Sequence, residues 1–330
     1  MKKEFIILIL FLVKMSSCCA QLQPMFVEGF AQGTTYHITY IDKEERFFKK
    51  EIDSILKDFD FSVSTYNPNS IITKVNTNKD VVLDNYFLTC FNQGKKVWKD
   101  THGTFDPTVF PLVNAWGFGP GKKQKIESRK IDSILKFVGF NLINLKNNKV
   151  VKSDSRVALD FNAFAQGYSV DVIASFLNSK GITSYIVEIG GEVYAQGTSE
   201  EGKKWVIGIE TPIENKAASN PIIQNIQLDG LAIATSGNYR KYIEEDGTKY
   251  AHHIDPRTGY PTKNSLLSVS IVSKKGIISD AYATGVLVMG LEKAIKFLKK
   301  HKELEAFLIY ADTEGKYQFY ETPRFKLLKI

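Results

Sequence analysis

Hydroxyl, amide, imidazole, carboxylate and guanidinium groups come together in one stretch of the chain, TSGNYRKYIEEDGTKYAHHIDPRTGYP at positions 235–261. The apolar run Leu228–Ser236 leads into it and predicts a buried strand, which Gly237 and Asn238 end with a turn. Two prolines and a glycine in its last part, DPRTGYP, favour tight turns that hold side chains rigidly. A polar turn at the end of a buried strand is a common position for catalytic groups.

The imidazole and carboxylate groups of this stretch permit two interpretations. In the first, one of the adjacent residues His252 and His253 is a general base oriented by Asp255, because base catalysis needs an imidazole and a carboxylate within reach of each other. In the second, the histidines are solvated and Asp255 only stabilises its own turn. An isolated His-x-Asp favours the second interpretation, so the rest of the chain has to decide between them.

A second oxygen-rich motif, SDAYATG, precedes the apolar run VLVMG nearer the C-terminus. Asp280 and Thr284 are four residues apart, so a helix that has begun by Asp280 places both oxygens on one face. A carboxylate and a hydroxyl on adjacent turns suit a hard cation such as Mg²⁺, which takes oxygen ligands. The alternative is a helix-capping Asp followed by an ordinary helical Thr.

Two further segments combine polar groups with features of ligand sites. Asp160 and Asn162 end an apolar run and lead into a helix predicted to begin near Ala165, and a helix N-terminus favours an anion such as phosphate. Residues 102–121 are so rich in Gly, Pro and aromatic residues that we predict an ordered loop, which either packs as a plug or lines a pocket. Three rings in this loop either stack on a planar ligand or belong to the core, namely those of Phe105, Trp116 and Phe118.

The composition is that of an ordinary globular protein, since 43% of the 330 residues are hydrophobic and 24% are charged. The net charge of +7 comes from basic residues spread along the chain. The sequence has no basic stripe interleaved with aromatics and no zinc-finger spacing, so we do not expect it to bind nucleic acid. It also contains neither a G-x-G-x-x-G after a strand nor a P-loop, which argues against a doubly wound nucleotide site.

Residues 1–19 have the pattern of an export signal. Two lysines precede the apolar run Phe5–Val13, which is too short to span a membrane stably, and small residues follow it. Cys18 stands where a bacterial lipoprotein carries its lipidated cysteine, although an N-terminal buried helix is the alternative. We therefore predict a leader at 1–19, one domain at 20–330, and a location at the periplasmic face of a membrane. Cys90 is the one cysteine certain to remain after the leader, so we expect no disulfide framework.

Hydrophobic periodicity predicts helices and strands in mixed order, without a regular alternation of the two. The predicted helices are Glu44–Phe59, a helix capped by Ser70, Asp84–Lys99, Ile131–Val138, Ala165–Gly181 and Leu291–Lys300. The predicted strands are one within Met25–Ile41 that is entered through Gly33, Tyr185–Val193 with Trp205–Glu210 as its partner, Leu266–Val272 and Ala306–Ala311, with a hairpin at Val151–Leu159. Gly190 and Gly191 interrupt the second strand, and we expect a bulge or a close backbone approach to a ligand there.

In this order the motifs resemble the ApbE family of bacterial flavin transferases. Five blocks match and together span nearly the whole chain after the leader: QGTTY at 32–36, STYNPNS at 64–70, GTFDPTVFPLVNAWGFG at 103–119, LDFNAFAQGYSVD at 159–171 with IGGE at 189–192, and TSGNYR, HHIDPRTGYP and SDAYAT within 235–284. The resemblance implies an α+β fold in one compact unit, with a flavin pocket between two α/β halves.

The resemblance also implies an activity, that of a Mg²⁺-dependent FAD:protein FMN transferase. Such an enzyme moves FMN from FAD onto a Thr or Ser hydroxyl of a target protein and releases AMP. FAD is then the substrate, Mg²⁺ the cofactor, and the partner an exported electron-transfer protein. Contact with a membrane is expected only through a lipid at Cys18.

By the same resemblance, His252 is the base for the acceptor hydroxyl and Asp255 orients its loop. The metal positions implied are Asp280, Thr284 and the carbonyl oxygen of Ala163. The implied flavin contacts are Gln32, Tyr66, Thr104, Phe105, Asp106, Asp160, Gln166 and Ile254.

The chain departs from the usual family pattern at several of these positions. The family usually has Met at Gln32, a Gly pair at Asn162 and Ala163, Lys or Glu at Gln166, Asp at Asn238 and Asn at Glu188. Because Gln166 lacks the charge that a Lys would offer a phosphate, we expect FAD binding to be weaker or shifted while activity is kept. Two other functions stay open, namely an FAD pyrophosphatase that uses water in place of the acceptor, and a flavin-binding lipoprotein without turnover.

Overall fold

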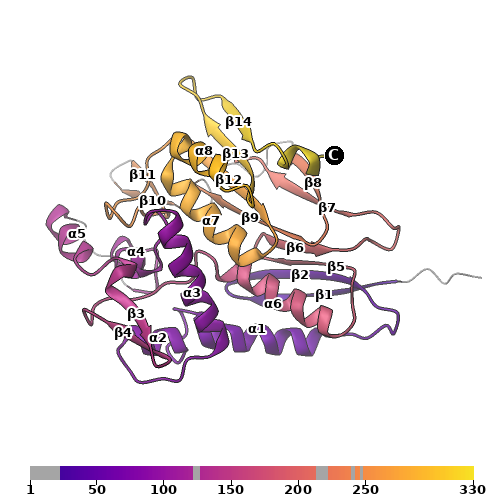
Figure 1. Cartoon of the computed structure of the whole chain (residues 1–330), viewed down its shortest axis with the longest axis horizontal. Coiled ribbons are helices and arrows are strands. Elements are labelled where there is room, and N and C mark those ends of the chain that lie inside the picture. The colour runs from indigo at the N-terminus through magenta and orange to yellow at the C-terminus, as the bar shows by residue number, and fades with distance from the viewer. Residues whose placement is uncertain (1–22, 122–126, 213–221, 239–241, 246–247) are drawn as a thin grey trace, which may run out of the picture.

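The computed structural model describes residues 23–121, 127–212, 222–238, 242–245 and 248–330, with the backbone alone for 242–245 and 248–251. At its centre is an eight-stranded sheet in which every neighbouring pair of strands is antiparallel (Figure 1). In spatial order the strands are β1 (Pro24–Ala31), β2 (Thr34–Ile41), β5 (Tyr185–Ile189), β6 (Glu192–Gln196), β9 (Leu231–Gly237), β12 (Leu266–Ser273), β13 (Glu305–Ala311) and β14 (Tyr317–Glu321). An antiparallel sheet agrees with the predicted absence of a doubly wound fold.

Helices cover one face of this sheet (Figure 1). α6 (Ala165–Ser179) packs against β5 and β6, and α7 (Gly276–Met289) packs against β9 and β12. α7 is buried on nearly all sides because α3 (Asn85–Asp100) and α8 (Leu291–Lys300) also lie against it. The remaining helices are α1 (Lys49–Val63), α2 (Ile71–Asn76), α4 (Phe110–Trp116), α5 (Ser128–Leu135), and the short 3₁₀ turns η1 (Pro107–Val109), η2 (Phe140–Leu142) and η3 (Phe325–Leu328).

Three small hairpins complete the described part of the chain. They are β3–β4 (Ile143–Lys146 and Lys149–Lys152), β7–β8 (Trp205–Glu210 and Ile222–Leu228) and β10–β11 (Tyr242–Glu245 and Thr248–Ala251). The hairpin β7–β8 and η3 pack on the sheet through a separate apolar cluster that includes Val193, Ile226, Ile233 and Phe325. The mixed α+β class predicted for the chain is confirmed, with the helices and strands forming one compact unit.

Most of the predicted helices are present, because their signals are local. Ser70 caps α2 by accepting a hydrogen bond from the Thr73 N–H at 3.1 Å. Asp84 caps α3 by accepting from the Phe87 N–H at 2.8 Å. The helix predicted at Ala165 begins at that residue. Among the described residues, no helix is both long enough and apolar enough to cross a membrane.

The helix α4 corrects the prediction of an irregular loop at 102–121. The prolines of this segment are tolerated because Pro107 and Pro111 stand in the first turns of η1 and α4, where a backbone N–H is not needed. Gly117 ends α4 in the left-handed conformation, with a φ of 83°. The prolines and glycine that favoured a loop at the sequence level therefore mark the starts of η1 and α4 and the end of α4.

The strand predictions were wrong in their pairing more than in their position. Residues 24–41 form two strands joined at Gln32 and Gly33, whose φ angles of 54° and 74° suit a two-residue hairpin turn. The two residues Gly190 and Gly191 are likewise the turn between β5 and β6, in place of the predicted bulge. Trp205–Glu210 pairs with β8 and not with the 185–193 segment, and the hairpin predicted at 151–159 lies earlier, at 143–152.

Candidate active site

The helices α6 and α7 cross in direct backbone contact beside the predicted metal residues. A Cβ atom on Gly167 would overlap the carbonyl oxygen of Gly276, and a Cβ atom on Gly276 would overlap that of Gly167. Only glycine fits at both positions, so the two residue types allow the helices to approach this closely. Figure 1 shows the ends of the two helices meeting near the centre of the molecule, next to the sheet.

Asp280 lies at this crossing and is buried. Its Oδ2 accepts a hydrogen bond from the Gly167 N–H at 2.9 Å, and among the described residues no hydrogen bond reaches its Oδ1. Burial, together with the charge of Asp171, raises the pKa of Asp280 to about 7. A buried carboxylate with one unused oxygen is a ligand position that a cation would stabilise.

Thr284 and Ala163 lie at the same place, as predicted for the metal residues. The Thr284 hydroxyl donates to the carbonyl oxygen of Ala163 at 3.4 Å, and Thr284 shares the face of α7 on which Asp280 lies. Carboxylate, hydroxyl and carbonyl oxygens are the donors that Mg²⁺ takes, so the residues present fit this metal. Among the described residues there is no cluster of three or more His, Cys, Asp or Glu, the kind of group that would suit zinc instead.

The turn after residue 251 is rigid, as its prolines and glycine predicted. Ile254 pairs with Pro261, and the Asp255 N–H donates to the Tyr260 carbonyl oxygen at 2.9 Å. The indole N–H of Trp116 donates to the Gly259 carbonyl oxygen at 2.8 Å. Ile254 itself is buried in an apolar cluster formed with α4 and α5. The turn is therefore fastened to the helical layer and not free in solvent.

The carboxylate of Asp255 is occupied by Arg257. Its Oδ1 accepts from the backbone N–H and from Nε of Arg257, both at 2.9 Å, and its Oδ2 accepts from Nη2 at 2.7 Å. Asp255 therefore shapes the turn, which agrees with the loop-orienting role that the resemblance implied. In the described part of the chain, no hydrogen bond joins the Asp255 carboxylate to an imidazole, so the first interpretation of this stretch gains no support here.

The two adjacent histidines have different environments. His253 is buried, and its Nδ1 lies 3.1 Å from the amide oxygen of Asn238. Burial, and to a lesser extent the neighbouring His252, lowers the pKa of His253 well below its ordinary value, which favours the neutral form of its ring. His252 is half-buried, with its ring 3.9 Å from that of His253 and 6.3 Å from that of Phe118. His252 is thus the more accessible imidazole, and His253 is held in place beneath it.

The end of β9 joins the histidines to the predicted metal residues. Ser236 lies with its hydroxyl 3.1 Å from that of Thr284, and Asn238, two residues further on, contacts His253. Two residues along an extended strand span about 7 Å. The sequence marked this strand end as a place for catalytic groups, but the roles of Ser236 and Asn238 depend on contacts with distant segments. Tyr239 and Arg240, from the same stretch, lie outside the described residues.

Two of the predicted flavin contacts lie at hairpin turns of the sheet, Gln166 beside the β5–β6 turn and Gln32 in the β1–β2 turn. The amide nitrogen of Gln166 would lie 2.8 Å from a Cβ atom on Gly190. Ser169 links the start of α6 to the β1–β2 turn, because its hydroxyl donates to the Gln166 carbonyl oxygen at 2.7 Å and lies 3.4 Å from Oε1 of Gln32. The Nε2 of Gln32 is buried and has no hydrogen-bond partner among the described residues. An unpartnered buried donor of this kind is a position where a ligand acceptor fits.

Tyr66 and Asp160 form a second group of predicted flavin contacts. The Tyr66 ring is exposed and its hydroxyl donates to the carbonyl oxygen of Phe118 at 3.3 Å, which brings it beside the ring that faces His252. Partial desolvation of the Tyr66 hydroxyl and the nearby Asp160 carboxylate raise the pKa of Tyr66. Asp160 is buried, accepts from the Asn162 N–H at 2.8 Å, and has its pKa raised by burial to about 6.

The three remaining predicted flavin contacts, Thr104, Phe105 and Asp106, are buried and already contact other groups of the protein. The hydroxyl of Thr104 lies within hydrogen-bond distance of the carbonyl oxygens of Thr101 and Gly285, at 3.1 and 3.0 Å. Phe105 belongs to the main core, with its ring 5.3 Å from that of Phe164. The Asp106 carboxylate accepts hydrogen bonds from Thr108 and Phe140. Contact of these side chains with a flavin stays a prediction.

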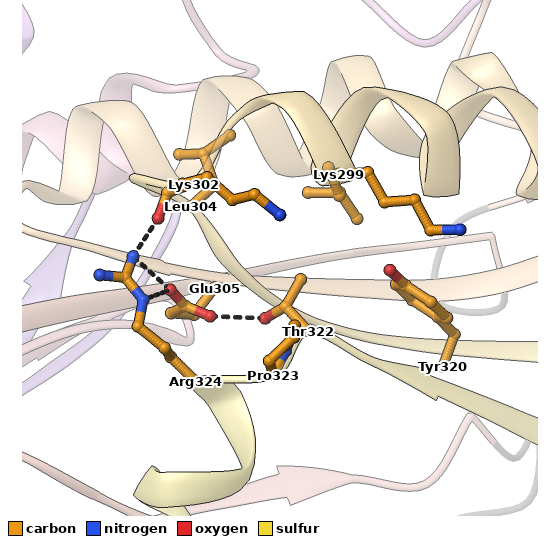
Figure 2. A pocket seen from close by; sticks show the side chains of 9 residues that line it. Lys299, Lys302, Leu304, Glu305, Tyr320, Thr322, Pro323 and Arg324 are labelled. Atoms are coloured by element: carbon orange, nitrogen blue, oxygen red, sulfur yellow. Dashed lines mark hydrogen bonds and ion pairs between the residues drawn. The ribbon is translucent and has the colours of Figure 1, made fainter.

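A cavity of about 630 Å³ lies away from these residues, between α8, β13 and β14 (Figure 2). Lys299, Lys302 and Tyr320 line it, and Arg324 beside them is paired with Glu305. None of the predicted site residues contributes to its wall. The cavity therefore has no part in the site described above.

Known proteins resemble the chain over nearly its whole length. The sequence model of the ApbE family matches residues 32–308. A protein of Haemophilus influenzae called FAD:protein FMN transferase is 33% identical over 94% of this chain and 93% of its own length. The solved structure of the flavin transferase ApbE from Vibrio cholerae is 31% identical, covers 93% of this chain and 99% of its own, and superposes with a TM-score of 0.84. A Thermotoga maritima ApbE structure superposes with a TM-score of 0.82 at 27% identity. The match in motifs, fold and length shows that this chain belongs to the ApbE family.

Proposed function

We propose that this protein is an FAD:protein FMN transferase that uses a divalent cation, with His252 as the base. The observation that carries the proposal is the end of β9, where Ser236 contacts the proposed metal residue Thr284 and Asn238 contacts His253, the neighbour of His252. A base and a cation site are thereby tied to one strand end. The chain also belongs to a family whose members carry this activity in their names.

The reaction joins the FMN phosphate of FAD to the acceptor and breaks the pyrophosphate. The hydroxyl oxygen of a Thr or Ser forms a bond to the phosphorus that carries FMN, the P–O bond to AMP breaks, and AMP leaves with the electron pair. His252 takes the proton of the hydroxyl, which requires an accessible imidazole at the site. The ring of His253 packs against that of His252, and Asn238 bonds His253 and so fixes it to the end of β9.

Asp280, Thr284 and the carbonyl oxygen of Ala163 would hold the cation. A divalent cation bound there would neutralise charge on the pyrophosphate oxygens. Gln166 brings an amide group to the β5–β6 turn, and Gln32 brings one to the β1–β2 turn, where each fits a hydrogen-bond acceptor of the flavin or its phosphates. The aromatic ring of Tyr66 is exposed beside Phe118 and offers a face for the planar flavin.

The decisive experiment follows the fate of FAD. The protein is incubated with FAD and Mg²⁺, with and without EDTA, and with and without an exported electron-transfer protein as acceptor. Mass spectrometry is then run on the proteins and on the solution. We expect an FMN adduct on a Thr or Ser of the acceptor and an equal amount of AMP, both abolished by EDTA. FAD left intact in every sample would contradict the proposal.

The same experiment separates the two alternative functions. Free FMN and AMP without an adduct, with every acceptor tried, would make the protein an FAD pyrophosphatase. Tight FAD binding without AMP release would make it a binding protein. The control for removing the His252 imidazole is His301→Ala. His301 lies at the end of α8 and bonds Glu303, away from the candidate site. This variant should leave the reaction unchanged.

We also propose that the protein is exported and anchored by a lipid on Cys18. Residues 1–19 lie outside the described residues, so the proposal rests on their sequence pattern alone. Labelling cells with a radioactive fatty acid is expected to mark the protein, and Cys18→Ser is expected to abolish the label. Labelling that survives in Cys18→Ser would rule out this anchor.

A further inference from the structure

The two helices that cross at the site carry the same short motif. Residues 167–171 read GYSVD in α6 and residues 276–280 read GIISD in α7, so each has a glycine followed four residues later by an aspartate. Both motifs lie in the first turns of their helices. The N–H groups of a first turn have no acceptor inside their own helix and need one from elsewhere.

Each aspartate caps the other helix. Asp171 accepts hydrogen bonds from the Gly276 N–H at 2.6 Å and the Ile277 N–H at 3.0 Å, while Asp280 accepts from the Gly167 N–H at 2.9 Å. Neither helix has a cap of its own, because the residues at both N-cap positions make no side-chain hydrogen bond to the helix. We call the four residues Gly167, Asp171, Gly276 and Asp280 the helix clasp.

The helix clasp holds together the two sides of the cation site. The carbonyl of Ala163 comes from the segment that enters α6, whereas Asp280 and Thr284 come from α7. The glycines set the distance between the helices, because their backbones touch. The capping hydrogen bonds set how far α7 is rotated and shifted along α6. The relative positions of the metal donors therefore depend on the clasp.

The two aspartates of the clasp differ in whether a carboxylate oxygen remains without a hydrogen bond. Both oxygens of Asp171 are occupied by N–H groups of α7, whereas Asp280 uses one oxygen for α6. We propose that Asp171 is a positioning residue for the cation: it fixes the first turn of α7 and so places the free oxygen of Asp280 relative to the Ala163 carbonyl. This inference rests on the cation site of the proposed function.

The test is the Mg²⁺ dependence of Asp171→Asn. The side chain of Asn offers one acceptor oxygen in place of two, so one of the two N–H groups of α7 loses its partner. The Mg²⁺ concentration at half-effect is measured by the rise in melting temperature with Mg²⁺ alone, and separately by AMP release from FAD. We expect it to increase about 10- to 100-fold, because residues that orient metal ligands carry effects of this size. The rate at saturating Mg²⁺ should stay within about threefold of wild type.

Asp84→Ala is the matched control. Asp84 caps α3 through the Phe87 N–H and also accepts from Ser62, so its loss removes a comparable cap from another helix. We expect a lower melting temperature and an unchanged Mg²⁺ midpoint. An unchanged midpoint in Asp171→Asn would overturn the positioning role. Asp171→Glu, which keeps the charge on a longer side chain, is expected to raise the midpoint and decides the question if the Asn variant does not fold.

Asp280→Asn separates this inference from the proposed function. A weakened Mg²⁺ effect in Asp280→Asn but not in Asp171→Asn would leave the cation site standing and overturn the clasp as its positioning device. A wild-type Mg²⁺ midpoint in Asp280→Asn would overturn the cation site itself, and the inference with it.

Discussion

The α6–α7 crossing and the turn at 252–261 each place an aspartate at the candidate site, and the two carboxylates are used differently. At the crossing, Asp280 is buried and accepts one hydrogen bond, from Gly167. In the turn, both oxygens of Asp255 are occupied by Arg257. A carboxylate with an unused oxygen can bind a ligand, whereas one whose oxygens are filled by its own neighbours mainly shapes the chain.

The comparison extends to how firmly each region is held. The crossing is built on two helices whose backbones touch, and such supports position ligands more accurately than loops do. The turn is held by the Trp116 indole, by Ile254 in an apolar cluster and by the His253 contact with Asn238. We infer that the cation side of the site is held more tightly than the base side. The following variants test this contrast.

Asp280→Asn should have the strongest effect on activity. Asn retains an acceptor for the Gly167 N–H but lacks the negative charge, so we expect transfer to fall about a thousandfold, which corresponds to the several kcal/mol that a catalytic cation supplies. The melting temperature without Mg²⁺ should not fall, because an uncompensated buried charge is removed. AMP release and thermal unfolding are the measurements. Activity close to wild type would remove Asp280 from the cation site.

His252→Ala should lower the rate of transfer about a hundredfold, at the low end of what a general base contributes. FAD affinity, measured by quenching of flavin fluorescence, should change little, because His252 is not itself one of the proposed flavin contacts. The matched His253→Ala variant should act by loosening the turn, so it should lower the melting temperature as well as the rate. Full activity in His252→Ala would sink the assignment of the base.

Asp106→Asn tests an aspartate that is buried and occupied by protein donors. Burial raises the pKa of Asp106 to about 6, from 3.8 in the unfolded chain. Between these values the folded state binds more protons than the unfolded state, so stability from this group is present at low pH and is lost as pH rises through about 6. The difference between the two pKa values corresponds to a change of about 3 kcal/mol in the free energy of unfolding.

The variant is expected to lack this part of the pH dependence. Urea unfolding at pH 4.5 and pH 7 should therefore show a smaller loss of stability for Asp106→Asn than for wild type. Equal losses in the two proteins would mean that the folded and unfolded pKa values of Asp106 are the same.

Arg257→Ala should have the smallest effect. The Asp255–Arg257 pair is partly exposed, with the Arg side chain 39% exposed, and such pairs contribute about 1 kcal/mol or less. Asp255 would still accept from the backbone N–H of residue 257. We expect the transfer rate to fall about fivefold or less. A loss as large as that of Asp280→Asn would show that the turn is held mainly by this ion pair, which would break the contrast between the two regions.

Several features of the fold were predictable because their causes lie within a few residues. Capping by Ser70 and Asp84 is set by a side chain and an N–H three residues away. The common face of Asp280 and Thr284 follows from the helical repeat alone. The pairing of strands was not predictable in this way. Trp205–Glu210 alternates like any strand, and periodicity does not say which neighbour it will find.

The candidate site likewise has features that local sequence predicts and features that only contacts between distant segments determine. The residue types of the HHIDPRTGYP turn, the SDAYAT motif and the family blocks suffice to indicate a base, a cation site and the ApbE family. The tertiary structure decides that Asp255 bonds Arg257, that Ser236 and Asn238 join the two halves of the site, and that Asp171 caps a helix 105 residues away. Short-range hydrogen bonds are encoded by spacing along the chain. The long-range contacts depend on the order of strands in the sheet, because that order brings distant segments together only in the folded protein.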